Sequence, residues 1–363
     1  MGVRALAIPY SRTIIGGIPW YSVLIVTGIL LAVLLAEREE KRLGLPKDTA
    51  IDLALIVVPC GIIGARLYYV AMTWELFRHN PISILYVWQG GIAIYGGGIG
   101  GALGAWAYAR RKKLSFPRLA DIVAPGLLLA QAIGRWGNYF NMEAYGPEIG
   151  NPLFQFFPLG VLVSTEDGYV WHMATFFYES MWNLAGFCAL WLIRKRQRGA
   201  GSLFCWYLLI YGSGRFVIEQ LREDSLYLGG LRVSQYLSLA LCALAAGVLL
   251  WRASRGDKRW FAVAVGCLAA WLARWACLER LGLYALLCVA ALAAVLWLAR
   301  RKGALVWLLC AAAALDALGV LAAWLGAPFS AGFAACLHAL LCSVSLPGYV
   351  AALALDGIPM RHK

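Results

Sequence analysis

The sequence contains few charged residues for its length. Only 14% of its 363 residues are Asp, Glu, Lys or Arg, whereas 62% are hydrophobic. A soluble globular domain carries about 25% charged residues. The deficit extends along the whole chain, which excludes a soluble protein with a single anchor. It indicates a protein that crosses the membrane many times.

Several signatures of metal-dependent and secreted proteins are also absent. The ten cysteines form no C-x-x-C pair and nearly all lie in apolar segments, so they are expected to pack as small hydrophobic side chains. The chain has no zinc-ligand spacing, no phosphate-binding G-x-x-x-x-G-K-[ST] loop and no G-x-S-x-G motif. No metal and no cofactor are therefore expected. The N-terminus lacks the pattern of a cleavable signal peptide, so the first apolar segment is expected to stay in the mature protein.

The net charge of +13 is distributed in a way that indicates membrane topology. Basic residues cluster in every second short segment between apolar runs, at 38–42, 110–113 with Arg118, 194–198, 252–259, 300–302 and 361–363. Alternating loops rich in Lys and Arg are typical of the cytoplasmic side of a membrane protein. The pattern favours topology and contact with anionic membrane lipid over a nucleic-acid partner.

The apolar runs predict an all-α polytopic membrane protein, since a spanning helix needs about 20 apolar residues. A seven-span core is expected, followed by about four extra C-terminal spans. The core spans are predicted at about 14–36, 49–72, from after Gln89 to 108, 119–136, 173–193, 202–221 and 231–251. Segment 74–88 is expected to be a loop with interfacial aromatic residues. Segment 137–171, with three prolines and several acidic residues, predicts a small extracytoplasmic cap.

The charge pattern also predicts orientation and domains. If the basic segments are cytoplasmic, the N-terminus lies outside, and the cap and the loop at 222–230 open on that same side. Residues 1–257 are then one membrane domain that includes the cap. Residues 258–363 are an additional transmembrane region, for which packing helices are the favoured interpretation.

One polar motif stands where an apolar run ends. Residues 134–146 read G-R-W-G-N-Y-F-N-M-E-A-Y-G and carry Arg135, Asn138, Asn141 and Glu143. A charged side chain near the bilayer centre costs about 2.5–3.5 kcal/mol on insertion scales, so such residues are usually functional. Arg135 and Asn138 share a helix face if the helix continues that far, and both suit a phosphate ester. For Asn141 and Glu143, helix capping and mutual pairing remain an alternative.

A second motif, at 88–101, reads W-Q-G-G-I-A-I-Y-G-G-G-I-G-G. Glycines this dense at a helix start let a backbone or a headgroup approach closely, and free N–H groups there can hold an anion. Gly96 and Gly97 are the candidates, with the phenol of Tyr95 at the same depth. Close helix packing through small residues is the alternative.

A third motif lies in the predicted span at 202–221. Tyr211, Arg215, Glu219 and Arg222 are three or four residues apart and would form a polar stripe on one helix face. Arg215 and Glu219 have the spacing of an intramembrane salt bridge. A bridged arginine can still present its guanidinium to an anion.

The remaining polar residues are less informative. His172 at a membrane boundary is more often a satisfied interfacial residue. Tyr178-Glu179 lies near the outer start of the predicted span at 173–193. Pro19-Trp20-Tyr21 and Arg66 with Tyr69 complete the polar inventory.

At these residues the chain resembles the prolipoprotein diacylglyceryl transferases of bacterial membranes. It carries that family's G-R-x-G-N-x-x-N-x-E-x-x-G signature at Gly134–Gly146 and its W-Q-G-G-I-A-I-Y-G-G motif. It also carries the late Y-G-x-x-R-x-x-x-E-x-x-R motif at Tyr211–Arg222. The resemblance covers about Ile18–Trp251, and the extension at 258–363 inherits nothing from it.

The resemblance implies an enzyme of the bacterial cytoplasmic (inner) membrane whose site opens toward the outer leaflet. Such an enzyme transfers the diacylglyceryl group of phosphatidylglycerol to the lipobox cysteine of a preprolipoprotein signal peptide. A thioether forms and glycerol phosphate is released. By resemblance the catalytic residues are Arg135, Arg215, Tyr95 and Glu143. Phosphatidylglycerol would be bound by Arg135, Asn138, Asn141, Gly96, Gly97, Tyr21, Glu219 and Arg222.

The residues fit that chemistry independently of the resemblance. Negative charge builds on the leaving phosphate, and fixed guanidinium groups in a low-dielectric site stabilise such charge well. The chain departs from the family at two positions, with Tyr95 where a histidine is frequent and Met173 where His172 is usually followed by proline. A phenol is a poor base at neutral pH and a cysteine thiol is mostly protonated there. His172 and Glu143 are candidates for activating the thiol, and the base stays unassigned.

Two other functions fit a membrane protein with these residues. A transporter that binds phospholipid headgroups would use the same arginine pair, but no inverted repeat is visible in the seven predicted core spans. A non-catalytic membrane scaffold would not need Arg135, Asn138, Glu143, Arg215 and Glu219, all of which are present.

Overall fold

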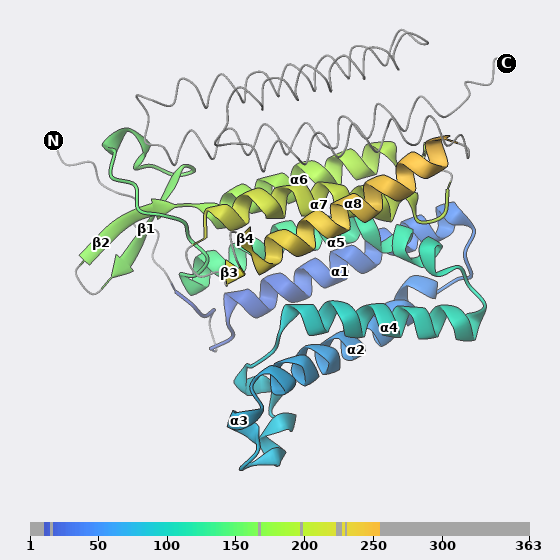
Figure 1. Ribbon diagram of the computed structural model, residues 1–363, viewed down its shortest axis with the longest axis horizontal. Coiled ribbons are helices and arrows are strands. Elements are labelled where there is room, and N and C mark those ends of the chain that lie inside the picture. The colour runs from blue at the N-terminus through green and yellow to red at the C-terminus, as the bar shows by residue number, and fades with distance from the viewer. Residues whose placement is uncertain are drawn as a thin grey trace, which may run out of the picture. The chain divides into compact units, whose positions relative to one another are not determined.

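The computed structural model describes residues 11–14, 17–165, 168–196, 199–222, 227–228 and 231–254 (Figure 1). The predicted C-terminal region at 258–363 lies outside these residues. The chain divides into two compact units. One comprises Met1–Leu24, Gln131–Ala189 and Cys205–Lys363, and the other comprises Ile25–Ala130 and Leu190–Phe204.

Helices make up most of the described chain. The α-helices are α1 (Trp20–Leu43), α2 (Thr49–Met72), α3 (Trp74–Phe77), α4 (Ile94–Lys112), α5 (Phe116–Asn141), α6 (Thr175–Ile193), α7 (Ser202–Gln220) and α8 (Val233–Ser254). Short 3₁₀ helices are η1 (Pro81–Leu85), η2 (Val87–Gln89) and η3 (Pro152–Phe154). The strands are β1 (Gly160–Thr165), β2 (Gly168–Met173), β3 (Tyr227–Leu228) and β4 (Leu231–Arg232).

Three helices in the described ranges are long and apolar enough to cross a membrane, namely α1, α2 and α5. The expected helical membrane architecture is confirmed at this level. Helices α6 and α7 have 19 residues each. Helix α6 contains Glu179 and Asn183, and α7 contains Arg215 and Glu219.

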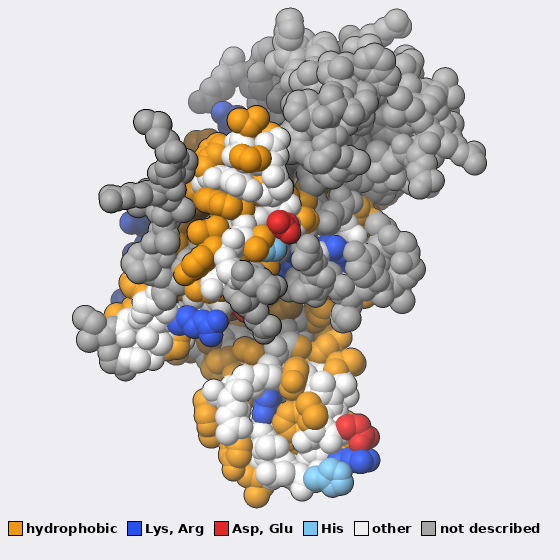
Figure 2. All heavy atoms as spheres, turned by 90° about the vertical axis from the view of Figure 1, so that its left-hand side faces the viewer, with side chains coloured by type: hydrophobic (Ala, Val, Ile, Leu, Met, Phe, Trp, Pro, Cys, Tyr) orange, Lys and Arg blue, Asp and Glu red, His pale blue; other side chains and the backbone are white. Residues whose placement is uncertain are grey.

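The surface of the described helices is rich in apolar side chains. Leu30, Leu55, Leu67 and Leu103 on α1, α2 and α4 are each at least 58% exposed. Figure 2, which looks onto the left-hand end of Figure 1, shows hydrophobic side chains over much of the described surface, with Lys, Arg, Asp and Glu side chains scattered among them. Lipid contact accounts for such a surface, because large exposed apolar areas are rare on soluble monomers.

The helix ends differ from the sequence predictions in ways that have local causes. Helix α2 has the predicted bounds, but α1 begins at Trp20 rather than at residue 14 and continues through the basic segment at 38–42 to Leu43. Glu, Lys and Arg are good helix formers, and the Arg42 guanidinium donates to Glu39 at 2.6 Å within the last turns. The first basic segment is thus helical rather than a loop.

The start of α4 and the end of α5 lie within two of the sequence motifs, the glycine-rich motif and the Gly134–Gly146 signature. Gly90 and Gly91 have φ angles of 86° and 72°, and α4 therefore begins at Ile94 rather than just after Gln89. Helix α5 extends to Asn141, five residues beyond the predicted end at Trp136. Arg135 and Asn138 consequently lie on one helix, three residues apart, as their spacing predicted.

Segment 74–88 was expected to be a loop and instead contains α3, η1 and most of η2. Its side chains include apolar ones that remain exposed, with Trp74 at 52% and Trp88 at 74%. The interfacial position expected for these aromatic residues stays a prediction. We call residues 73–93 the arm.

The cap contains a β-hairpin that the sequence reasoning did not foresee. Strands β1 and β2 pair antiparallel, with Val161 opposite His172 and Val163 opposite Val170. The chain after α5 then runs along β2, since Gly146 N donates to Met173 O at 2.9 Å and Ile149 N donates to Trp171 O at 2.7 Å. The cap is therefore fastened to the start of α6. Its core is made of Tyr139, Val161, Val163, Ala174 and Phe176.

Helices α2 and α4 pack closely along their lengths through glycine (Figure 1). A Cβ on Gly64 would lie 2.8 Å from the Gly100 Cα, and one on Gly100 would overlap the Cys60 carbonyl oxygen. Gly96 lies in the same contact, against Gly64 and Tyr68. Close helix packing, the alternative left open for the glycine-rich motif, therefore applies to Gly96 and Gly100.

This packing predicts that Gly100→Ala destabilises the protein. The added methyl group has to push α2 and α4 apart, and overpacking of this kind costs about 1–3 kcal/mol. Gly98→Ala is the matched control, because a Cβ there meets nothing within 4 Å. Thermal unfolding in detergent should show a lower Tm for Gly100→Ala and a Tm for Gly98→Ala that is at least that of wild type, because alanine favours a helix over glycine. Equal Tm values for the two variants would refute the close contact.

Candidate active site

Two arginines from different motifs meet at one carboxylate. Arg135 on α5 places Nη2 2.6 Å from Glu179 Oε1, and Arg215 on α7 donates from Nη1 to Glu179 Oε2 at 3.3 Å. The Arg135 contact is a close ion pair without the alignment of a hydrogen bond. Arg215 Nη2 also lies 2.5 Å from Glu219 Oε2, which is the i,i+4 pair that the spacing predicted. We call these four residues the arginine–glutamate cluster.

The cluster is largely withdrawn from solvent. The side chains of Arg135 and Arg215 are each 17% exposed, and that of Glu179 is 3% exposed. Tyr211, one turn before Arg215 on α7, interacts electrostatically with Arg135, Glu179 and Arg215. Hydrogen-bond donors held in such a low-dielectric site bind an anion more strongly than donors in water.

Glycines in α7 let the helices that carry the cluster approach one another. A Cβ on Gly214 would collide with the Trp182 indole, and one on Gly212 would lie 2.6 Å from Cys242 Sγ. The Trp182 indole N–H donates to Ile210 O at 2.7 Å across α6 and α7. The glycines that precede Arg215 therefore have a packing role.

The turn after α5 holds the second half of the Gly134–Gly146 signature. Asn141 Nδ2 donates to Glu143 Oε1 at 3.1 Å, and Glu143 N donates to Asn138 O at 3.0 Å. Met142 and Ala144, on either side of Glu143, have φ angles of 54° and 57°. These left-handed conformations strain residues with a Cβ. Mutual pairing of Asn141 and Glu143, the alternative left open for them, is thus observed, and Glu143 is exposed rather than paired with Arg135.

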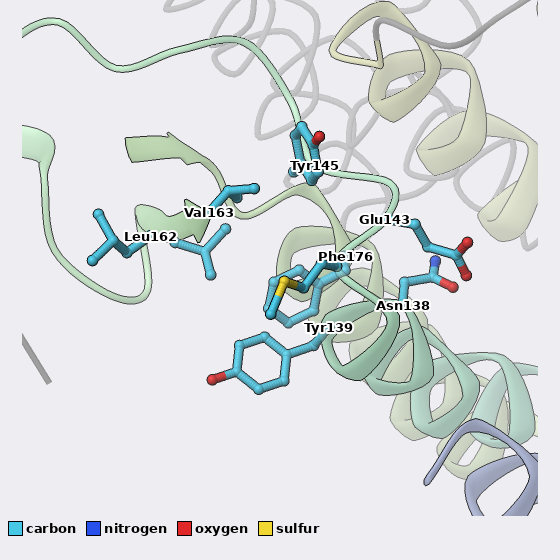
Figure 3. Close-up of a pocket in the computed structure, with 9 residues that line it drawn as sticks. Asn138, Tyr139, Glu143, Tyr145, Leu162, Val163 and Phe176 are labelled. Atoms are coloured by element: carbon cyan, nitrogen blue, oxygen red, sulfur yellow. The ribbon is translucent and has the colours of Figure 1, made fainter. Parts of the chain in front are cut away.

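A shallow pocket lies between this turn and the hairpin (Figure 3). The side chains of Asn138 and Glu143 lie next to each other at one end, away from Leu162 and Val163. The lining consists of Asn138, Tyr139, Met142, Glu143, Tyr145, Val161, Leu162, Val163 and Phe176. The signature thus presents polar groups at the edge of an otherwise apolar pocket in the cap.

Two glycines of the Gly134–Gly146 signature, Gly137 and Gly146, are in close contact with residues outside it. The Tyr21 ring packs against Gly137, where a Cβ would lie 3.1 Å from Tyr21 Cε2. A Cβ on Gly146 would lie 2.8 Å from Thr175 Cγ2 and 3.0 Å from Leu221 O. Both signature glycines are therefore required by close neighbours.

His172 has a structural partner. Its Nδ1 lies 2.9 Å from Gly146 O, and its ring packs on Tyr145 with centroids 4.7 Å apart. Since a carbonyl oxygen only accepts, Nδ1 carries the proton in this contact. His172 therefore has a satisfied side chain, as expected for most such histidines, and its interfacial position stays a prediction.

The glycine-rich motif belongs to the other unit, where Arg66 organises it. Arg66 is 6% exposed. Its Nη1 donates at 2.8 Å to both Gly90 O and Gly91 O, and it also donates to Ser83 O and Ile84 O at 2.6 and 2.8 Å. A Cβ on Gly91 would lie 2.6 Å from Arg66 Nη1. The first two glycines of the motif therefore serve to bring backbone carbonyls to a buried guanidinium.

The sequence of the described chain matches a known family. The family profile described as prolipoprotein diacylglyceryl transferase matches residues 11–251, about two thirds of the chain. The chain belongs to the prolipoprotein diacylglyceryl transferase family. The expected family and the expected transferase class are thereby confirmed.

Curated relatives carry the name phosphatidylglycerol–prolipoprotein diacylglyceryl transferase. A protein of Bacillus cytotoxicus is 47% identical over 246 residues, which cover 66% of this chain and 91% of the relative. Proteins of Bacillus cereus and Bacillus anthracis are 46% identical with the same coverage. These names favour neither the transporter nor the scaffold alternative.

In this diacylglyceryl transferase family member, the structure brings part of the predicted site together. Arg135, Arg215 and Glu219 lie in the arginine–glutamate cluster, and Asn138 lies one turn beyond Arg135 on α5. Arg222 is not on the predicted stripe, because α7 ends at Gln220. Tyr95, Gly96 and Gly97 lie at the start of α4 in the other unit, where the Tyr95 ring is 6.5 Å from that of Tyr68.

Two residues that organise these motifs were not among the predicted site residues. Glu179 was noted only as a polar residue near the start of a span, and Arg66 only as part of the polar inventory. In both cases the available signal was an ionisable residue inside an apolar run. Spacing alone did not identify their partners, which lie 36 to 44 residues away for Glu179 and 17 to 25 residues away for Arg66.

Arg66→Lys is expected to loosen the arm. A lysine ammonium has three donors and lacks the planar fork that reaches four carbonyls. The carbonyls belong to partly exposed residues, and losing an ordinary hydrogen bond of this kind costs about 0.5–1.5 kcal/mol. Limited proteolysis in detergent should cleave Arg66→Lys within residues 73–93 faster than wild type. Arg78→Lys is the control, because Arg78 is exposed and pairs within the arm with Glu75 at 2.8 Å. Equal cleavage of both variants would show that Arg66 does not hold the arm.

Proposed function

We propose that this protein transfers the diacylglyceryl group of phosphatidylglycerol to the lipobox cysteine of preprolipoprotein signal peptides. This would be the first step of lipoprotein maturation at the bacterial cytoplasmic membrane. The observation that carries the proposal is the meeting of Arg135 and Arg215 at Glu179. Each arginine comes from a different family motif, and both are largely buried.

The arginine pair suits the charge change of this reaction. The cysteine sulfur forms a bond to the terminal carbon of the diacylglyceryl group, and the bond from that carbon to the phosphate oxygen breaks. The phosphate diester thereby becomes a monoester, glycerol phosphate, and gains negative charge. Arg135 and Arg215 would stabilise that charge because guanidinium groups bind phosphate oxygens in a bidentate manner. The thiol proton leaves to a base that we do not assign.

The other signature residues would shape the substrate site. Asn138 is one turn beyond Arg135 and would donate to a phosphate or ester oxygen. Tyr21 packs on Gly137 beside it. Glu219 would keep Arg215 in place, and Asn141 and Glu143 would fix the turn that borders the pocket. We retain Arg222 as a candidate at the end of α7.

The glycine-rich segment of the other unit is proposed to bind substrate through groups of its own. Tyr95 and Gly96 lie in the first turn of α4, where backbone N–H groups would point toward an incoming anion. The next residue, Gly97, donates its N–H to Ala93 O at 3.2 Å, so Gly97 would act through the close approach that a residue without a side chain permits. Tyr95 is 38% exposed, so its phenol is accessible to a substrate. Gly96 would have two roles, since it would offer its backbone N–H to the anion and also pack closely on α2.

We propose the following topology for the chain. Helices α1, α2, α4, α5, α6, α7 and α8 would be the seven spans of the core, with the N-terminus and the cap outside. The basic residues near the ends of α1, α4 and α8 would then be cytoplasmic. Residues 258–363 would add further spans.

The transferase activity is testable with purified protein in detergent micelles. Incubation with phosphatidylglycerol and a lipobox peptide should yield a peptide whose cysteine carries a diacylglyceryl group, detected by mass spectrometry. Arg135→Ala and Arg215→Ala should each lower the rate by about 10²–10³-fold, as expected for the loss of a donor to a developing anion.

Arg78→Ala is the control for this experiment. It removes an exposed arginine whose partners, Glu75 and His79, are exposed residues of the arm, and its rate should equal that of wild type. No modified peptide with the wild type would overturn the proposed function. Full activity of Arg135→Ala in folded protein would remove Arg135 from the site.

A further inference from the structure

Glu179 is the carboxylate that joins the two arginine motifs. It lies on α6, outside the Gly134–Gly146 signature and outside the Tyr211–Arg222 motif. Its residue exposure is 2%. One of its oxygens contacts Arg135 and the other contacts Arg215. Among the described residues, Glu179 is the only ion-pair partner of Arg135.

The charges of the cluster balance only with Glu179 in place. Arg135 and Arg215 contribute two positive charges, and Glu179 and Glu219 contribute two negative charges. Glu219 lies 2.5 Å from Arg215 and is four residues away on the same helix, so it neutralises that arginine locally. Without the Glu179 charge, Arg135 would be a buried cation that lacks a partner, which is strongly unfavourable.

The geometry of the contact determines the spacing of the two guanidinium groups. The two oxygens of a carboxylate have a fixed separation, and each is engaged by a different arginine. A phosphate group also presents pairs of oxygens at a fixed separation to guanidinium N–H groups. Arginines that share one carboxylate therefore lie at a spacing that one phosphate group could also bridge.

We propose that Glu179 is a positioning residue, which holds Arg135 and Arg215 at the spacing needed for both to bind one phosphate group. This inference rests on the proposed function, because it concerns the phosphate of the same substrate.

The chain contains a matched control for this arrangement. Glu39 on α1 is also 2% exposed and also joins two arginines. Its Oε2 lies 2.6 Å from Arg42 Nη2 and its Oε1 lies 3.0 Å from Arg194 Nε. Arg42 and Arg194 belong to the basic segments that we propose to be cytoplasmic. Glu39→Gln therefore removes the same kind of buried bridge without touching the family motifs.

The test compares wild type, Glu179→Gln, Glu179→Asp and Glu39→Gln. For each protein, the KM for phosphatidylglycerol, kcat, and inhibition by glycerol phosphate are measured in the peptide assay. The upward shift of Tm caused by glycerol phosphate is measured separately, and it does not require turnover. Both glutamine variants are expected to lower the Tm of the ligand-free protein.

The anion-dependent readouts separate positioning from a structural role. Glu179→Gln should weaken glycerol phosphate inhibition at least about 10-fold, raise KM and abolish the glycerol phosphate Tm shift. Glu179→Asp, which keeps the negative charge, should recover part of the glycerol phosphate inhibition, part of the substrate KM and part of the Tm shift. Glu39→Gln should match wild type within about 2-fold in all three. If Glu179→Gln does not fold, Glu179→Asp carries the test, and wild-type anion affinity in that variant would overturn the proposal.

Three results distinguish this proposal from the proposed function. Loss of kcat in Glu179→Gln with unchanged glycerol phosphate affinity would overturn positioning and point to a role in the chemical step. Unchanged kinetics in Glu179→Gln with an active wild type would also overturn positioning, and the transferase function would stand. A wild type that makes no product but shows a Glu179-dependent Tm shift would overturn the transferase function and support positioning.

Discussion

The central constraint on this protein is the cost of holding two guanidinium groups among apolar helices. Arg135 and Arg215 are largely buried, and their charges are balanced by Glu179 and Glu219. Removing one partner of such a buried ion pair typically lowers the free energy of unfolding by about 3–5 kcal/mol. The helices α5, α6 and α7 that carry these residues must therefore approach closely and stay in register, and much of the local sequence serves that requirement.

Glycines in the unit that holds the cluster help to satisfy this requirement. Gly214 makes room for Trp182 between α6 and α7, and Gly137 makes room for Tyr21 on α5. Gly146 lets the cap lie against the start of α6. In the other unit, Gly90 and Gly91 direct carbonyls to Arg66. The glycines of the family motifs thus have specific steric reasons, and several of them do not need to contact substrate.

The sequence predicted the helices and motifs far better than the contacts between them. Apolar runs gave the existence of all the long described helices, and the i,i+4 spacing of Arg215 and Glu219 gave their ion pair, because these signals are local. The Arg135–Glu179 pair spans 44 residues, so no local spacing reveals it. The hairpin in the cap was missed because its strands are only six residues each. Helix ends differ from their predicted positions in two situations. Glycines with left-handed φ angles delay the start of α4, and charged residues with high helix propensity extend the end of α1.

The most direct test of the account is a structure of the protein with phosphatidylglycerol bound. The account predicts that the phosphate lies within hydrogen-bond distance of both Arg135 and Arg215 while Glu179 still contacts the two guanidinium groups. The reacting carbon of the diacylglyceryl group should face the side from which a peptide can enter. A phosphate bound elsewhere, with neither arginine in contact, would contradict the account.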